Sequence, residues 1–304
     1  MTKTMKEYFR KINLKRFLEK RPKDQFMAYI RKTSRKSEEK IPLASIDIKS
    51  KIEEIYIKNI QTFIINRKND ENQKLILYLH GGSYLSNPVI FHYRACDYLA
   101  ESLNAKIIFP IYPKAGLHTY KDTYRLLDMI YKKMLEKSKS QNISIIGDSA
   151  GGGLALGFSM YLRDKNMPLP KDLILYSLWL GLNCDNPKIK DYEESDYILS
   201  AWGLQKIGKI WAGCEPFKDK CEKIAHPYLS PIRGDFTSLP KISIFIGGCE
   251  IMLPDCMKLD EILRKKGIDH NFYIKKDLGH IYPLYPIKEG KDALVLSARI
   301  IDNP

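Results

Sequence analysis

The sequence is poor in cysteine, and its cysteines have no spacing that marks a metal site or a disulfide framework. Six cysteines stand among 304 residues, with no Cys-x-x-Cys pair and no Cys/His cluster at zinc spacing. A chain of this length buries enough surface to fold without crosslinks. We therefore predict six reduced thiols in a cytoplasmic protein, and we expect neither a metal nor an organic cofactor.

Long apolar runs are also missing. The longest, such as LILYL at residues 75–79, are far shorter than the roughly 20 apolar residues that span a bilayer. The N-terminal residues contain no apolar core of the kind found in secretory signal peptides. The sequence thus predicts a protein with no stable membrane insertion, located in the cytoplasm.

Acidic residues are outnumbered, and the imbalance is concentrated near the N-terminus. The net charge is +14, and residues 1–40 hold 14 Lys and Arg against 5 Asp and Glu. One hypothesis is a basic arm that makes weak contact with an anionic surface. The alternative, which we favour, is a solvated helical face that packs Phe9, Ile12 and Phe17 on the protein. The sequence has no nucleic-acid-binding motif and no Walker-type phosphate loop, so nucleic acid is not an expected partner.

Short apolar segments alternate with helical patterns through the middle and end of the chain. Near-continuous apolar runs are typical of strands buried on both faces. We predict such strands at residues 74–80, 105–112, 142–147, 172–180, 241–247 and 270–277. Helical spacing occurs between them at residues 91–104, 119–137, 152–165 and 255–267. The alternation predicts an α/β fold with a mostly parallel sheet flanked by helices.

A serine stands among glycines where one predicted strand meets a helix. Residues 147–151 read GDSAG and match the G-x-S-x-G motif in the strand–turn–helix context that the motif requires. A strand that turns directly into a helix strains the serine backbone, and the residues two positions away must be nearly bare. The turn also places the hydroxyl at a helix N-terminus, which favours a developing anion. Ser149 is therefore a candidate nucleophile.

The other groups that a nucleophilic serine needs occur at the ends of further strands. Gly81 and Gly82 come just after a predicted strand. Their N–H groups are expected to form an oxyanion hole together with the N–H of Ala150. Glu250 and His280 follow two later strands and are the candidate acid and base. Four such pieces at strand ends, in the order nucleophile, acid, base, favour catalysis over coincidence.

These motifs resemble those of the hormone-sensitive-lipase-like esterases of the α/β-hydrolase superfamily, also called the alpha/beta hydrolase fold-3 group. The resemblance extends from about residue 75 to residue 286 and rests on LHGGSY, GDSAGGG, PYLSPIRGD, GCEIMLPD and a closing GH. It implies an α/β-hydrolase fold with Ser149 as nucleophile, His280 as base and Glu250 as acid. It assigns the oxyanion-hole donors to Gly81, Gly82 and Ala150.

The resemblance also implies a helical cap, and two segments break the alternation of strands and helices. We accordingly expect an N-terminal cap segment at residues 1–45 and a cap insertion at residues 185–235. The hydrolase core would then comprise residues 46–184 and 236–304. Three motifs of this sequence depart from the family pattern. The chain has HGGS where the family commonly has HGGG, YPKAGLHTYK where the family has a segment like YRLAPEHPFP, and SLWLG where the family has SPW-x-D. These departures concern the shape of the pocket rather than the chemistry.

Two carboxylates in the segment GGCEIMLPDCMKLDEIL compete for the role of acid. Glu250 directly follows the predicted strand at residues 241–247, where an acid facing the histidine loop is expected. Asp255 follows Pro254 at the start of a helical pattern, where a carboxylate satisfies first-turn N–H groups. We choose Glu250 and retain Asp255 as the alternative.

The features together predict a serine carboxylester hydrolase of the carboxylesterase or acetylesterase type. It is expected to act on small, short-chain acyl esters through an acyl-enzyme intermediate. A small-substrate amidase or deacetylase would use the same residues and remains an alternative. A further alternative is a catalytically silent ligand-binding protein on the hydrolase scaffold, although such a protein is expected to lack one of the reactive groups.

Overall fold

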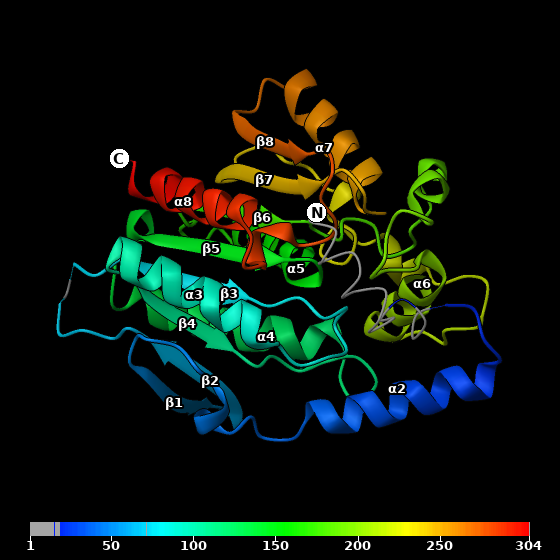
Figure 1. The fold of residues 1–304 in the computed structure, drawn as a ribbon, viewed down its shortest axis with the longest axis horizontal. Helices are drawn as coiled ribbons and strands as arrows, with labels where there is room; N and C mark the ends of the chain where they lie inside the picture. The colour runs from blue at the N-terminus through cyan, green and yellow to red at the C-terminus, as the bar shows by residue number, and fades with distance from the viewer. Residues whose placement is uncertain (1–14, 16–18, 71, 304) are drawn as a thin grey trace.

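An eight-stranded sheet organises the protein (Figure 1). The computed structural model describes Lys15 and residues 19–70 and 72–303. The strands lie in the order β1-β2-β4-β3-β5-β6-β7-β8. Their bounds are β1 Ile52–Ile57, β2 Ile60–Ile65, β3 Leu75–Leu79, β4 Lys106–Pro110, β5 Ile143–Asp148, β6 Asp172–Tyr176, β7 Lys241–Gly247 and β8 His270–Lys275. Strand β2 is antiparallel to both of its neighbours, and every other pairing is parallel.

The central strands are buried on both faces because helices cover both sides of the sheet. In β3 the alternate residues Leu75, Leu77 and Leu79 enter one hydrophobic cluster, and Ile76 and Tyr78 enter the other. Side chains of α3 (Ile90–Leu103) and α8 (Lys288–Asp302) belong to the second cluster, on the face toward the viewer in Figure 1. Side chains of α4 (Tyr120–Leu135), α5 (Ala150–Asp164) and α7 (Leu253–Lys265) belong to the first.

The predicted α/β fold with a mostly parallel sheet is confirmed, and each of the ten predicted elements occurs within a few residues of its expected position. Among the α-helices and strands of the described residues, β1, β2 and α8 fall outside both the ten predicted elements and the two predicted cap segments. Among the described residues, no helix combines the length and the apolar character needed to cross a membrane.

The two predicted cap segments, residues 1–45 and 185–235, contact each other through their described residues. Helix α2 (Lys23–Ser37) comes from the first segment, and α6 (Ala201–Trp211) comes from the second. The ring of Phe26 lies 5.1 Å from that of Trp202 and 5.9 Å from that of Phe217, both edge-on. This contact is consistent with one cap made of two segments, but the exact boundaries of the cap remain a prediction. The expected packing of Phe9, Ile12 and Phe17 lies outside the described residues.

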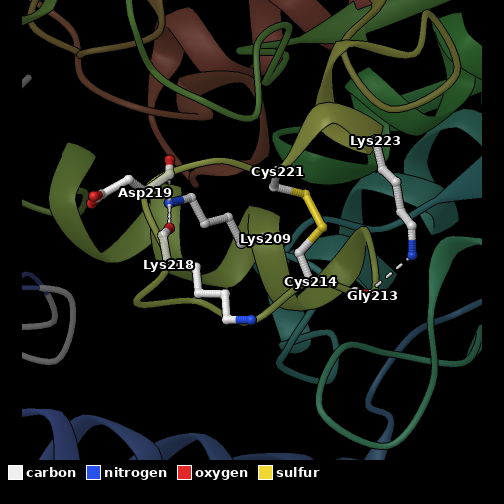
Figure 2. Close-up of a disulfide and its surroundings, with 7 residues drawn as sticks. All are labelled: Lys209, Gly213, Cys214, Lys218, Asp219, Cys221 and Lys223. Carbon is white, nitrogen blue, oxygen red and sulfur yellow. Dashed lines mark hydrogen bonds between the residues drawn. A yellow bond between two sulfur atoms is a disulfide. The ribbon is translucent and has the colours of Figure 1, made fainter.

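One pair of cysteines differs from the expectation of six reduced thiols. Cys214 and Cys221 form a disulfide in the loop after α6, with their Cα atoms 6.1 Å apart (Figure 2). The prediction of six reduced thiols failed because the spacing of these two cysteines matches no known motif. It is the path of the loop that brings them together. The Lys209 ammonium also donates to the carbonyls of Lys218 and Asp219 inside this loop. The other four cysteines are free.

Candidate active site

Ser149 occupies the sharp turn between β5 and α5. Its backbone has φ 54° and ψ −120°, a combination that costs free energy for a residue with a Cβ. A Cβ on Gly151 would lie 1.9 Å from the Leu79 carbonyl oxygen, and one on Gly147 would lie 2.3 Å from the Gly151 carbonyl oxygen. Only glycine therefore allows the helix and the strands to approach closely enough to form this turn.

His280 and Glu250 meet Ser149 from two further strand ends. His280 Nε2 lies 2.9 Å from Ser149 Oγ, and His280 Nδ1 lies 2.6 Å from Glu250 Oε2. All three side chains are buried. The arrangement matches a tautomer in which Nδ1–H donates to the carboxylate and Nε2 accepts from the hydroxyl. We call these three residues the Ser149 network.

The protonation of His280 reflects two opposing effects. Burial by itself lowers the pKa of the imidazole, because the charged form loses its hydration. The charge and the hydrogen bond of Glu250 act in the opposite direction, and Asp196 and Asp148 add to them. The net result is a pKa of His280 above its usual value. The site therefore stabilises an imidazolium, which a general base becomes when it takes a proton.

Further groups hold Glu250 and His280 in place. Glu250 Oε1 accepts from the Gly247 N–H at 2.7 Å and from Ser177 Oγ at 2.8 Å. Ser177 Oγ in turn accepts from the Ile281 N–H at 2.8 Å. Ile281 has φ 52°, which is rare for a β-branched residue and marks a strained backbone next to His280. Ser177 lies in the SLWLG segment, for which the sequence predicts an effect on pocket shape, whereas the structure shows that Ser177 holds Glu250.

Asp196 is a second buried carboxylate that the sequence reasoning missed. It accepts hydrogen bonds from the N–H groups of Ile198, Leu199 and Ile251 at 2.9 to 3.0 Å. These bonds tie the insertion that carries Asp196 to the residue directly after Glu250. Burial raises the pKa of Asp196 above its usual value. No sequence motif marks this position.

Asp255, the alternative acid, lies elsewhere. It stands in the first turn of α7, and its Oδ1 accepts from the Asn186 side-chain amide at 2.9 Å. Burial raises the pKa of this carboxyl above its usual range. The carboxylate that reaches His280 is that of Glu250, and Asp255 occupies the helix-start position that its sequence context suggested.

The glycine loop after β3 differs from the expected set of oxyanion-hole donors. The Gly81 N–H donates to Asp148 Oδ2 at 3.0 Å, so in this structure it does not point into the cavity. Gly82 and Ser83 line the cavity beside Ser149 instead, with φ values of 116° and 55°. Ala150 is the first residue of α5, and the N–H of a first helical residue has no partner within its helix.

Asp148, which directly precedes Ser149, anchors this loop. Besides the Gly81 N–H, it accepts from Tyr78 Oη at 2.8 Å, and its Oδ2 lies 3.2 Å from His92 Nε2. Burial lowers the pKa of His92, but the Asp148 carboxylate outweighs that effect, and the pKa is raised overall. A buried carboxylate with three partners of this kind fixes the glycine loop relative to the nucleophile.

A cavity of about 280 Å³ opens onto Ser149 and His280. The two outlying segments supply much of its apolar wall, with Tyr29 from α2 and Ile198, Leu199 and Ile207 from the segment around α6. Within the described ranges, no group of three or more His, Cys, Asp or Glu side chains is arranged to hold a metal ion. The cavity is mostly apolar, with polar groups gathered around Ser149, and it is close to the lower end of the size range of small-molecule sites.

Comparisons with known proteins show the family to which the chain belongs. A family model described as alpha/beta hydrolase fold matches residues 76–284. An acetyl-hydrolase of Streptomyces hygroscopicus is 26% identical over 235 residues, which is 76% of each chain. An esterase of Acinetobacter venetianus is 26% identical, over 73% of this chain and 72% of its own.

Solved structures of esterases superpose on nearly the whole chain. A candidate esterase from Staphylococcus aureus superposes with a TM-score of 0.86 at 28% identity, and the match covers 94% of this chain and 95% of that one. An esterase/lipase from an uncultured bacterium superposes with a TM-score of 0.80 at 25% identity, covering 98% and 96% of the two chains.

Proposed function

The chain belongs to the alpha/beta hydrolase fold family, and from this premise we propose that it is a serine carboxylester hydrolase of small, short-chain acyl esters. The observation that carries the proposal is the Ser149 network, in which a hydroxyl, an imidazole and a carboxylate are hydrogen-bonded in series at 2.9 and 2.6 Å. The names of the relatives, esterase and acetyl-hydrolase, support the same reaction class.

In the proposed acylation step, His280 Nε2 takes the proton of Ser149 as Oγ attacks the ester carbonyl. Glu250 stabilises the imidazolium that forms and keeps the ring in the required tautomer. The tetrahedral intermediate collapses as its C–O bond to the alcohol breaks, and His280 gives its proton to the departing alkoxide. Water then attacks the acyl-enzyme by the same route and releases the carboxylic acid.

The oxyanion would be bound by the N–H groups of Gly82, Ser83 and Ala150. Gly82 and Ser83 line the cavity, whereas the N–H of Gly81 is already donated to Asp148. We therefore assign Gly81 a positioning role and replace it with Ser83 as a donor. Because a donor acts through its backbone N–H, serine serves at this position as well as the glycine of the family motif.

The cap would limit the substrate. A cavity of about 280 Å³ enclosed by Tyr29, Leu199 and Ile207 has room for a short acyl chain but not for a long one. The ionisable side chains that line the cavity, such as Asp148 and His92, lie on the side of Ser149. The wall that the cap supplies is uncharged, which favours neutral, apolar acyl groups. Short-chain esters are accordingly the proposed substrates.

A series of p-nitrophenyl esters from acetate to palmitate tests the proposal. We expect kcat/KM to be highest for acetate to hexanoate and to fall steeply for longer chains. A fluorophosphonate probe is expected to label Ser149 alone. Absence of both hydrolysis and labelling would favour the silent ligand-binding alternative, and cleavage of p-nitroacetanilide at a comparable rate would favour an amidase.

A further inference from the structure

A second cavity lies on the sheet face that carries α4, at the edge where β3 and β4 begin. The pairing register explains which side chains reach it, because paired residues share a face and the face repeats every second residue. Ile64 pairs with Ile108, and Leu75 pairs with Lys106, two residues before Ile108. Ile55 lies on this face as well, two residues from Glu53, which is the partner of Ile64.

Helix α4 closes the other side of this cavity. Its residues Ile130, Lys133 and Met134, together with Lys137 just after its end, stand at the spacing of one helix face. Ile130 and Met134 are buried and continue the apolar floor. The enclosed volume is about 330 Å³. We call this cavity, with its apolar floor and the lysines around Lys106, the Lys106 groove.

The rim of the Lys106 groove is cationic, and its one ion pair among the described residues joins Arg67 to Glu53 at 3.3 Å. Arg67, Lys68, Lys106, Lys133 and Lys137 line it, and no Asp or Glu among the described residues does. Burial and the charges of Arg67 and Lys137 lower the pKa of Lys106 below its usual value. The positive charges are thus close enough together to repel one another.

Three of the four lysines that line the groove are unpaired within the described part of the chain, and the fourth, Lys68, donates to the Asn104 side chain. Lys106, Lys133 and Lys137 form no ion pair with any described residue. Lys132, the neighbour of Lys133 on the outer face of α4, pairs with Asp128 at 2.7 Å. Glu53 neutralises Arg67 alone, so the lysines remain as a cluster of cations over an apolar floor. Such a cluster is complementary to a ligand that supplies both a negative charge and an apolar chain.

We propose that the Lys106 groove is a binding site for a free fatty carboxylate, with the alkyl chain on Ile55, Ile64 and Ile108 and the carboxylate at the lysine rim. The apolar floor distinguishes this ligand from inorganic phosphate or a nucleotide. The site is separate from the active site, since β3 and β4 begin at the groove whereas Ser149 follows the opposite, carboxyl end of β5. It adds a binding function that ester hydrolysis does not require.

Calorimetric titration of the full-length protein with decanoate tests this site. We expect saturable binding that Lys106→Gln weakens by about ten-fold, the effect of losing one charged hydrogen bond. The double variant Lys133→Gln/Lys137→Gln removes two charges and should weaken binding further. Ile55→Asp places a carboxylate in the groove at a half-exposed position and is expected to abolish binding. Lys291→Gln, at an exposed site on α8, is the matched control and should bind as the wild type does.

Two ligand controls and one activity control complete the experiment. Decyltrimethylammonium, which has the same chain with the opposite charge, and inorganic phosphate, which has no chain, are expected not to bind. Hydrolysis of p-nitrophenyl acetate should be the same in all variants, because none of these residues contacts the Ser149 network. Equal affinity of wild type and lysine variants for decanoate would overturn the proposal, as would equally tight binding of the cationic amphiphile.

Discussion

The Ser149 network and the cap that covers it are held in place by different kinds of interaction. Each member of the network follows a strand end, and hydrogen bonds of 2.6 to 2.9 Å fix its orientation. In the cap, α2 contacts the segment around α6 through aromatic rings such as Phe26 and Trp202, and a disulfide closes the following loop. Hydrogen bonds tolerate little displacement, whereas apolar contacts adapt to changes of shape. Changes in the network should therefore affect turnover, and changes in the cap should affect substrate choice and stability.

The largest expected effect follows removal of the nucleophile. Ser149→Ala should lower kcat for p-nitrophenyl butyrate by roughly four to six orders of magnitude. Alanine keeps the Cβ that the turn already accommodates, so the melting temperature should stay close to that of the wild type. Steady-state kinetics and calorimetry measure the two quantities. Activity that persists in the purified variant would show that another residue is the nucleophile.

The pair Glu250→Gln and Asp255→Asn distinguishes the two candidate acids. Glu250→Gln should lower kcat by roughly three to four orders of magnitude, since glutamine neither fixes the tautomer nor stabilises the imidazolium. Asp255→Asn should leave kcat within a few-fold of the wild type. It should cost up to about 1 kcal/mol of stability, because Asp255 places a negative charge in the first turn of α7 and accepts from the Asn186 amide. The reverse ranking of the two variants in kcat would transfer the role of acid to Asp255.

The pH profile of Glu250→Gln provides an independent check. Activity requires neutral His280, so the acid limb of kcat/KM reports the pKa of this group. Glu250 raises that pKa against the effect of burial. Without the carboxylate, the acid limb should move to lower pH, and the loss of rate should persist on the alkaline side. An acid limb that does not move would mean that Glu250 exerts no charge on His280.

A smaller effect is expected from Asp148, which holds the glycine loop rather than the substrate. Asp148→Asn keeps the shape of the side chain but removes the charge that faces His92 and the Gly81 N–H. We expect kcat to fall by roughly ten- to a hundred-fold, less than the two to three orders of magnitude typical of losing an oxyanion donor itself. KM should change little. A change in KM alone would show that the loop positions substrate and not the transition state.

Changes in the cap are expected to alter the selectivity for acyl chain length. Tyr29→Ala should enlarge the cavity and raise the ratio of kcat/KM for p-nitrophenyl decanoate over butyrate by about ten-fold. Turnover of the acetate ester should remain within a few-fold of the wild type, because Tyr29 lies outside the Ser149 network. Gln25→Ala, an exposed position on the same helix, is the control and should leave the ratio unchanged. An unchanged ratio in Tyr29→Ala would remove α2 from the acyl-binding wall.

The sequence predicted the central strands because they are buried on both faces and are therefore continuous apolar runs. Strand β1, IEEIYI, lies at the edge of the sheet and is mostly half-exposed, so its pattern is mixed and carries a weaker signal. The placement of Ser149, Glu250 and His280 at strand ends could be inferred from motif order. The bond between Gly81 and Asp148 could not, because it depends on how two strand ends face each other in space. The same holds for Asp196, which reaches the site from an insertion.

The smallest effect on catalysis is expected from loss of the disulfide. This variant is the most direct test of whether the cap influences the Ser149 network. Cys214→Ser/Cys221→Ser, or reduction with a dithiol, opens a loop that carries Phe217, one of the rings packed on Phe26. For so short a loop the chain-entropy account gives a loss of about 2 kcal/mol in unfolding free energy. The Ser149 network contacts none of these residues, so kcat for p-nitrophenyl acetate should stay within two-fold of the wild type. Calorimetry with and without dithiol measures the first quantity, and Cys184→Ser, which removes a thiol outside the disulfide, is the control for the reagent. A fall in kcat as large as that of Asp148→Asn would mean that the cap holds the network as well as the substrate, and that the division between the two regions is wrong.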